Sequence, residues 1–148
     1  IYLDIMCGII CLINKSKLNS INKLQLKNSI NNRGPDDFNY VNYKNIIMGH
    51  SRLSIQNITE LGKQPYIYDD NILIYNGEIY NCEELKKKYE IESDLDTDLI
   101  IKLYNKYKNI FFSKIISEFD GIFSFCILDK ALDKLYVVRD MLGVKPLY

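Results

Sequence analysis

The sequence has no tryptophan, three prolines, one histidine and no excess of charge of either sign. Because nineteen Lys and Arg residues balance nineteen Asp and Glu residues, the chain lacks the basic footprint of a protein that binds nucleic acid or an anionic membrane. Its apolar runs are too short to span a bilayer. The four cysteines, at positions 7, 11, 82 and 126, form no CxxC pair, so neither a zinc site nor a disulfide framework is predicted. We expect a globular cytoplasmic protein with reduced thiols and no metal.

The 148 residues suffice for one domain with a hydrophobic core, and hairpin signals dominate their pattern. Strands are predicted at Gly8–Ile13, Tyr40–Tyr43, Ile46–Met48, His50–Gln56, Asn71–Tyr75, Ile122–Asp129 and Leu135–Asp140, and helices at Leu18–Asn31, Cys82–Tyr89, Leu99–Tyr107 and Ser113–Glu118. A sharp turn is predicted at Asn76-Gly77-Glu78, because Asn and Gly both tolerate positive φ. This order indicates an α+β fold rather than a doubly wound parallel sheet.

Cys7 stands at the leading tip of the first predicted strand. If Met6 were the initiator and were removed, Cys7 would carry a thiol of pKa about 8.5 beside an α-amine of pKa about 8, which together form a nucleophile and a base. With Ile1–Met6 attached, the amine becomes an amide. Taken alone, Met-Cys-Gly-Ile favours a core cysteine. A lipidated cysteine is disfavoured, because Asp4 interrupts the apolar run and no basic segment precedes it.

Three other positions carry side chains or turns suited to a site, and each has an ordinary structural alternative. Strand alternation puts Arg52 on the face opposite Leu53, where its guanidinium either enters a cleft or lies in solvent. Asp96 either binds a ligand or caps the following helix, and Thr97 and Asp98 compete for both roles. The Asn76-Gly77 dipeptide by itself favours a simple hairpin turn.

Seven motifs occur in one order along the chain. They are Met6-Cys7-Gly8-Ile9, Arg33-Gly34-Pro35-Asp36, His50-Ser51-Arg52-Leu53-Ser54-Ile55, Asn76-Gly77-Glu78-Ile79-Tyr80-Asn81, Asp96-Thr97-Asp98, Asp120-Gly121-Ile122-Phe123, and Arg139-Asp140 through Gly143-Val144-Lys145-Pro146-Leu147-Tyr148. Together they resemble the glutamine amidotransferase domain of glutamine-hydrolysing asparagine synthetases, over nearly the whole chain from Met6 onward. The resemblance implies an N-terminal nucleophile hydrolase fold, an αββα sandwich of antiparallel sheets.

The resemblance also implies a role for each site residue. Cys7 attacks the glutamine amide to form a thioester, and the Asn76 side chain and the Gly77 N–H stabilise the oxyanion. Arg52 binds the α-carboxylate of glutamine, and Asp96, with Glu78 as a second candidate, binds the α-ammonium. The family contacts its substrate through the backbone around Leu53 and Ile55. Arg33, Asp36 and His50 are interpreted as residues that order the surroundings, and Cys11, Cys82 and Cys126 receive no catalytic role.

Segment 1–6 is then an extension absent from the mature enzyme, and 7–148 is an amidotransferase domain that lacks its last strands. The resemblance implies a C-terminal synthetase domain that uses ATP and Mg²⁺ to amidate aspartate, and no glycine-rich nucleotide-binding loop occurs in this chain. The implied partners are glutamine, that synthetase domain and a second copy in a homodimer. Two alternatives stay open: an inactive scaffold or regulatory domain, and the amidotransferase half of a related amide-forming synthetase.

Overall fold

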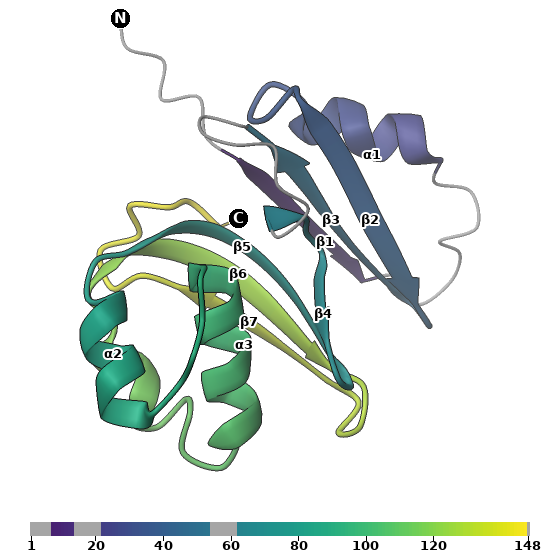
Figure 1. The fold of residues 1–148 in the computed structure, drawn as a ribbon. Helices are drawn as coiled ribbons and strands as arrows, with labels where there is room; N and C mark the ends of the chain where they lie inside the picture. The colour runs from purple at the N-terminus through teal and green to yellow at the C-terminus, as the bar shows by residue number, and fades with distance from the viewer. Residues whose placement is uncertain (1–6, 14–21, 54–61, 148) are drawn as a thin grey trace, which may run out of the picture. The chain divides into compact units, whose positions relative to one another are not determined.

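The computed structural model describes residues 7–13, 22–53 and 62–147. The chain forms two compact units, Ile1–Pro65 and Tyr66–Tyr148, and each has its own antiparallel sheet (Figure 1). Four predictions fall at least partly outside the described residues: the extension 1–6, the first turn of the helix predicted from Leu18, the end of the strand predicted at His50–Gln56, and the substrate contact at Ile55.

The first unit pairs three strands beside one helix (Figure 1). Its elements are β1 (Gly8–Ile13), α1 (Lys23–Ile30), β2 (Asp37–Tyr43) and β3 (Ile46–Arg52), with the sheet order β1-β3-β2. Helix α1 begins after Asn22, whose side chain accepts from the Gln25 N–H while the Gln25 side chain accepts from the Asn22 N–H. This capping box satisfies two donors at the start of the helix. Leu26, Phe38 and Ile47 form the buried core.

Strands β2 and β3 form the antiparallel pair predicted around Lys44-Asn45, and both strands are longer than the predicted segments Tyr40–Tyr43 and Ile46–Met48. The predicted strand at Ile46–Met48 and the start of the one predicted at His50–Gln56 join through Gly49 into β3. A Cβ on Gly49 would lie 2.9 Å from Cγ2 of Ile10 on β1, so glycine serves here to let neighbouring side chains approach rather than to end the strand.

The second unit is a four-stranded antiparallel sheet whose one face carries two helices (Figure 1). Its elements are β4 (Tyr66–Tyr68), β5 (Asn71–Ile79), α2 (Cys82–Tyr89), α3 (Asp96–Lys106), the 3₁₀ helix η3 (Ile115–Glu118), β6 (Gly121–Asp129) and β7 (Lys134–Arg139), with the sheet order β4-β5-β6-β7. Strand β4 was not predicted. The hairpin of β6 and β7 and the helix α2 agree with the predicted elements.

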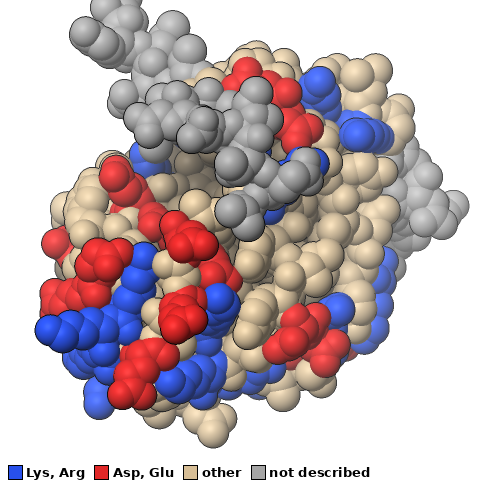
Figure 2. Space-filling view, viewed as in Figure 1, with Lys and Arg blue, Asp and Glu red and all other residues tan. Residues whose placement is uncertain are grey.

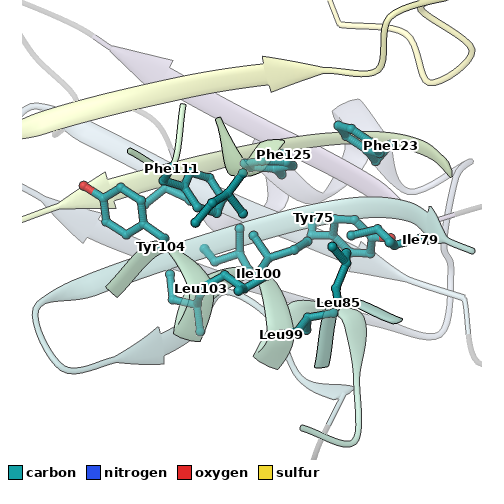
Figure 3. Close-up of a cluster of buried hydrophobic side chains, with 14 of the residues drawn as sticks. Tyr75, Ile79, Leu85, Leu99, Ile100, Leu103, Tyr104, Phe111, Phe123 and Phe125 are labelled. Carbon is teal, nitrogen blue, oxygen red and sulfur yellow. The ribbon is translucent and has the colours of Figure 1, made fainter. Parts of the chain in front are cut away.

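The core of the second unit lies between its sheet and helices α2 and α3 (Figure 3). Helix α3 contributes Leu99, Ile100, Leu103 and Tyr104, which share one face of the helix, and all four are buried. The ring of Tyr104 meets the ring of Phe111 edge to face, with centroids 5.4 Å apart. This packing fixes the position of α3, and therefore of its first residues, against β5.

The predicted turn at Asn76-Gly77-Glu78 is wrong. Strand β5 runs through these residues to Ile79 and stays paired with β6, with Gly77 opposite Phe123. Gly77 has φ +155°, and a Cβ there would overlap the Ile122 carbonyl oxygen and lie 2.6 Å from Cα of Phe123. Glycine is required by the close approach of β6, and continuous pairing outweighs the local turn preference of Asn-Gly.

The predicted α+β class, with two antiparallel sheets and few helices, is confirmed, as expected of a fold of the N-terminal nucleophile hydrolase type. Figure 2 shows Lys and Arg side chains interspersed with Asp and Glu over α2 and α3. Among the described helices, none combines the length and the apolar character that a membrane crossing requires.

Candidate active site

The thiol of Cys7 lies beside the backbone of Leu53. The Leu53 N–H donates to Sγ of Cys7 at an N···S distance of 3.4 Å, and Sγ lies 3.9 Å from the Leu53 carbonyl oxygen. The cause is the pairing of β1 with β3, in which Gly8 is opposite Ser51, so the residues that flank this pair come together. Cys7 and Leu53, 46 residues apart in the sequence, thus meet, and Arg52, the last residue of β3, directly precedes Leu53.

The segment Arg33–Asp36 supports the end of β3. The Asp36 N–H donates to the Arg52 carbonyl oxygen at 3.1 Å, and the Ser51 hydroxyl donates to the Gly34 carbonyl oxygen. A Cβ on Gly34 would lie 2.5 Å from the Arg52 carbonyl carbon, so this position has no room for a side chain. These contacts are those of a loop that fixes the backbone at Arg52, as the sequence interpretation of Arg33 and Asp36 expects.

His50 is buried within β3 and is held neutral. Burial, above all, and the positive charge of Arg52 lower its pKa to about 4, while the negative charge of Asp37 acts in the opposite direction. Its Nε2 atom is buried and has no hydrogen-bond partner among the described residues. A pKa this low makes His50 a weak base at neutral pH, so the interpretation of His50 as a positional residue stays a prediction.

The remaining candidates lie in the second unit, on β5 and at the start of α3. Asn76 is buried, with 6% of its surface exposed, and pairs with Ser124 across the β5–β6 ladder. Strand alternation puts the side chains of Asn76 and Glu78 on the face of β5 opposite that of Tyr75 and Ile79. Glu78 is exposed.

Asp96 does not cap helix α3. Leu95 is the N-cap residue and makes no side-chain capping bond, whereas the Asp96 carboxylate turns to the end of β5. Its Oδ2 accepts hydrogen bonds from the Tyr75 hydroxyl at 2.9 Å and from the Ile79 N–H at 3.0 Å. Asp98, the competing carboxylate, pairs instead with Tyr66 and Lys102.

Cys82 is the residue that the sequence interpretation missed. Its Sγ lies 3.0 Å from Oδ1 of Asp96 and 3.1 Å from the Ile79 carbonyl oxygen. Burial and the Asp96 carboxylate raise the pKa of this thiol to about 12, and the same causes raise the pKa of the Tyr75 hydroxyl. No periodic pattern links the start of α2 to the start of α3, so the sequence contains no signal for this contact.

The structure thus groups the predicted residues by unit: Cys7, Arg52 and Leu53 in the first, and Asn76, Gly77, Glu78 and Asp96 in the second. The first group contains a thiol beside the Leu53 backbone and a cationic residue directly before Leu53, and the second contains a buried amide and a hydrogen-bonded carboxylate. Within the described ranges, no three His, Cys, Asp or Glu side chains come together as a metal site.

The sequence of this chain is similar to that of several known proteins. A family model described as a glutamine amidotransferase domain matches residues 6–148. The chain is 40% identical to a putative asparagine synthetase (glutamine-hydrolysing) of Methanocaldococcus jannaschii, with 97% of this chain and 32% of the relative covered. A probable asparagine synthetase of Acanthamoeba polyphaga mimivirus is 38% identical (97% and 27% covered), and asparagine synthetase 1 of Bacillus subtilis is 37% identical (97% and 24%).

The chain therefore spans about a third or less of the length of these curated relatives. The resemblance to the amidotransferase region of asparagine synthetases, based on seven short motifs, is confirmed over nearly the whole chain. This chain belongs to the family of glutamine amidotransferase domains.

Proposed function

We propose that this domain hydrolyses glutamine at Cys7 and supplies the released ammonia to an amide-forming reaction. The observation that carries the proposal is the position of the Cys7 thiol beside the backbone of Leu53, the residue that follows Arg52 in the chain. A nucleophile next to a group that can hold the substrate carboxylate is what an amide hydrolase for an amino acid needs.

In this reaction the Cys7 sulfur attacks the side-chain amide carbon of glutamine, and the Cys7 α-amine takes the thiol proton. The C–N bond then breaks, and the same proton goes to the leaving nitrogen. Ammonia departs, and a γ-glutamyl thioester remains on Cys7. Water attacks the thioester, so that glutamate and the free thiol are regenerated. The scheme requires Cys7 to be the first residue of the mature chain, so 1–6 is absent from the active enzyme and 7–148 forms the amidotransferase domain.

Binding in this scheme follows from charge. The planar Arg52 guanidinium holds the α-carboxylate through two parallel hydrogen bonds, and Asp96, with Glu78 as a second candidate, accepts hydrogen bonds from the α-ammonium. The resemblance further assigns substrate contacts to the backbone at Leu53 and Ile55. The Asn76 amide and the Gly77 N–H donate to the oxyanion, and loss of one such donor typically costs about 2.7 to 4 kcal/mol of transition-state stabilisation.

For the whole protein we propose glutamine-dependent amidation of aspartate, since the relatives are named asparagine synthetases. ATP and Mg²⁺ would then be used by a synthetase domain in sequence beyond 7–148, and no step in this domain passes through them. The homodimer and the cytoplasmic location are further predictions.

The proposal is tested on the protein expressed from its native gene. Its intact mass and N-terminal sequence are determined, and ammonia release from glutamine is compared between the wild type and Cys7→Ala. We expect a chain that begins at Cys7, turns over glutamine and loses this activity in Cys7→Ala, while amidation with added ammonium persists. An intact segment 1–6 without glutamine hydrolysis would instead identify a scaffold domain, and amidation of an acceptor other than aspartate would identify a related synthetase.

A further inference from the structure

We infer that Tyr75 and Cys82 are positioning residues that orient the Asp96 carboxylate toward the α-ammonium of glutamine. The inference rests on the proposed function, because it takes Asp96 as the ammonium ligand. It adds two residues that none of the seven motifs singles out for a role at the site.

Three elements of the second unit meet at the Asp96 carboxylate. Tyr75 and Ile79 donate from β5 to Oδ2, and Cys82, the first residue of α2, lies at Oδ1. Asp96 is itself the first residue of α3. A carboxylate held from both oxygens by separate elements cannot rotate about its terminal bond without losing hydrogen bonds, so its plane is set by the fold.

The arrangement leaves acceptor capacity for a substrate. A carboxylate has about four lone-pair positions, and the three donors occupy two on Oδ2 and one on Oδ1. Asp96 is partly exposed rather than buried. Among the described residues these are the donors that reach the carboxylate, so an ammonium group would use the second position on Oδ1.

Both side-chain donors keep their protons over the whole physiological range. The pKa of Cys82 is raised to about 12 by burial and by Asp96, and the pKa of Tyr75 is raised by the same causes. The Cys82 thiol has one hydrogen and two acceptors in reach, and the anionic Asp96 oxygen is the stronger acceptor. The thiol thus acts as a donor at this position and not as a second nucleophile.

The ring and the hydroxyl of Tyr75 make separate contacts, so the hydroxyl can be removed alone to test the inference. The ring belongs to the core together with Ile79 and Leu85 (Figure 3), whereas the hydroxyl contacts Asp96. Tyr75→Phe retains the ring and removes only the donor. Cys82→Ala removes the thiol donor, and Cys82→Ser replaces it with a hydroxyl donor of similar size.

The test measures glutamine hydrolysis in the protein expressed from its native gene. We expect Tyr75→Phe to raise KM for glutamine about 5- to 20-fold, at or below the lower end of the range for one hydrogen bond to a charged group, because the Ile79 N–H still holds Oδ2. We expect kcat to change less than about twofold. Cys82→Ala should raise KM less, and Cys82→Ser should restore it. Since these residues act through Asp96, adding Tyr75→Phe to Asp96→Asn should raise KM no further.

A second readout separates positioning from general damage. Glutaramate has the amide and the carboxylate of glutamine but no α-amino group, so its inhibition constant should not change in Tyr75→Phe or in Cys82→Ala. Equal weakening of glutamine and glutaramate, or an unchanged KM in all three variants, would overturn the inference. Wild-type protein that releases no ammonia would overturn the proposed function instead. If Tyr75→Phe does not fold, the KM values of Cys82→Ala and Cys82→Ser test the inference.

Discussion

A Cβ placed on Gly62 would lie 3.0 Å from Nη2 and 3.4 Å from Cζ of Arg52. Gly62 therefore lies close to the guanidinium group, and any side chain at position 62 would compete with Arg52 for the same space. The crowded atoms belong to the far end of a flexible side chain, so the fold can accept the change by moving Arg52. A site for the substrate carboxylate would not tolerate that movement.

Gly62→Ala is accordingly predicted to affect binding and not stability. We expect KM for glutamine to rise about tenfold, because a displaced guanidinium loses its paired hydrogen bonds, and the free energy of unfolding to change by less than about 0.5 kcal/mol. Steady-state kinetics and thermal unfolding measure the two quantities. On an Arg52→Gln background the added alanine should have no kinetic effect, and an additive effect there would refute the prediction.

Gly77→Ala provides the opposite case. Its Cβ would overlap the Ile122 carbonyl oxygen and crowd Cα of Phe123, which are backbone atoms, and its φ of +155° strains any other residue. We expect a loss of about 3 kcal/mol or more in the stability of the paired strands β5 and β6. Hydrogen exchange of their amides reports this loss, with Gly62→Ala as the matched glycine-to-alanine control. Unchanged protection factors would contradict the clash.

The sequence predicted elements whose own pattern agrees with their burial. Helix α2 was predicted with the bounds that the structure has, because Leu85 and Tyr89 recur one turn apart and both are buried. The prediction for Asn76-Gly77 was wrong, because a local turn preference is weaker than a ladder that pairs β5 with β6 on both sides of Gly77. Strand β4 has three residues, too few to show alternation.

Part of the candidate site was likewise predicted from the sequence, and part was found only in the structure. The residues of the motifs were found from the sequence, because each motif is contiguous. The partners of Asp96 were not, since Tyr75, Ile79 and Cys82 reach it only after β5, α2 and α3 have packed. A contact that depends on three elements has no signature in the sequence of any one of them.

Asp129 is predicted to contribute stability that depends on pH. Its fully buried carboxylate accepts from Lys108 at 2.6 Å, from the Tyr104 hydroxyl at 2.8 Å and from the Leu132 N–H at 2.9 Å. Burial opposes ionisation, but these donors prevail and hold the pKa of Asp129 below its usual 3.8. Asp129→Asn should therefore cost about 2 to 4 kcal/mol at pH 7.

The sign of the pH dependence follows from the lowered pKa. A carboxylate that is more acidic in the folded state stabilises the protein above its unfolded pKa, and this contribution is lost as the pH falls through the folded value. The difference between wild type and Asp129→Asn should thus be constant from pH 7 to pH 5 and shrink below 3.8. Hydrogen exchange of the β6–β7 amides measures it. Asp94→Asn, the same change at an exposed carboxylate, is the control, and equal losses in both variants would contradict the prediction.

Cys82 is predicted to resist alkylation in the folded protein. Only the thiolate reacts, and burial together with Asp96 raises the pKa of this thiol from 9.0 to about 12. At pH 8 its thiolate fraction is then about a thousandfold lower than in the unfolded chain, so we expect iodoacetamide to modify Cys82 at least about a hundredfold more slowly before unfolding in urea than after it.

Mass spectrometry of the peptide that contains Cys82 gives both rates. Asp96→Asn is the informative variant, because it removes the negative charge and the anionic acceptor while leaving the burial of the thiol in place. Cys82 of this variant should react faster than Cys82 of the wild type, and its alkylation rate should begin to rise at a lower pH. Were Asp96→Asn to leave the rate unchanged, burial alone would protect the thiol, and the hydrogen bond from Cys82 to Asp96 would lose its place in the orientation of that carboxylate.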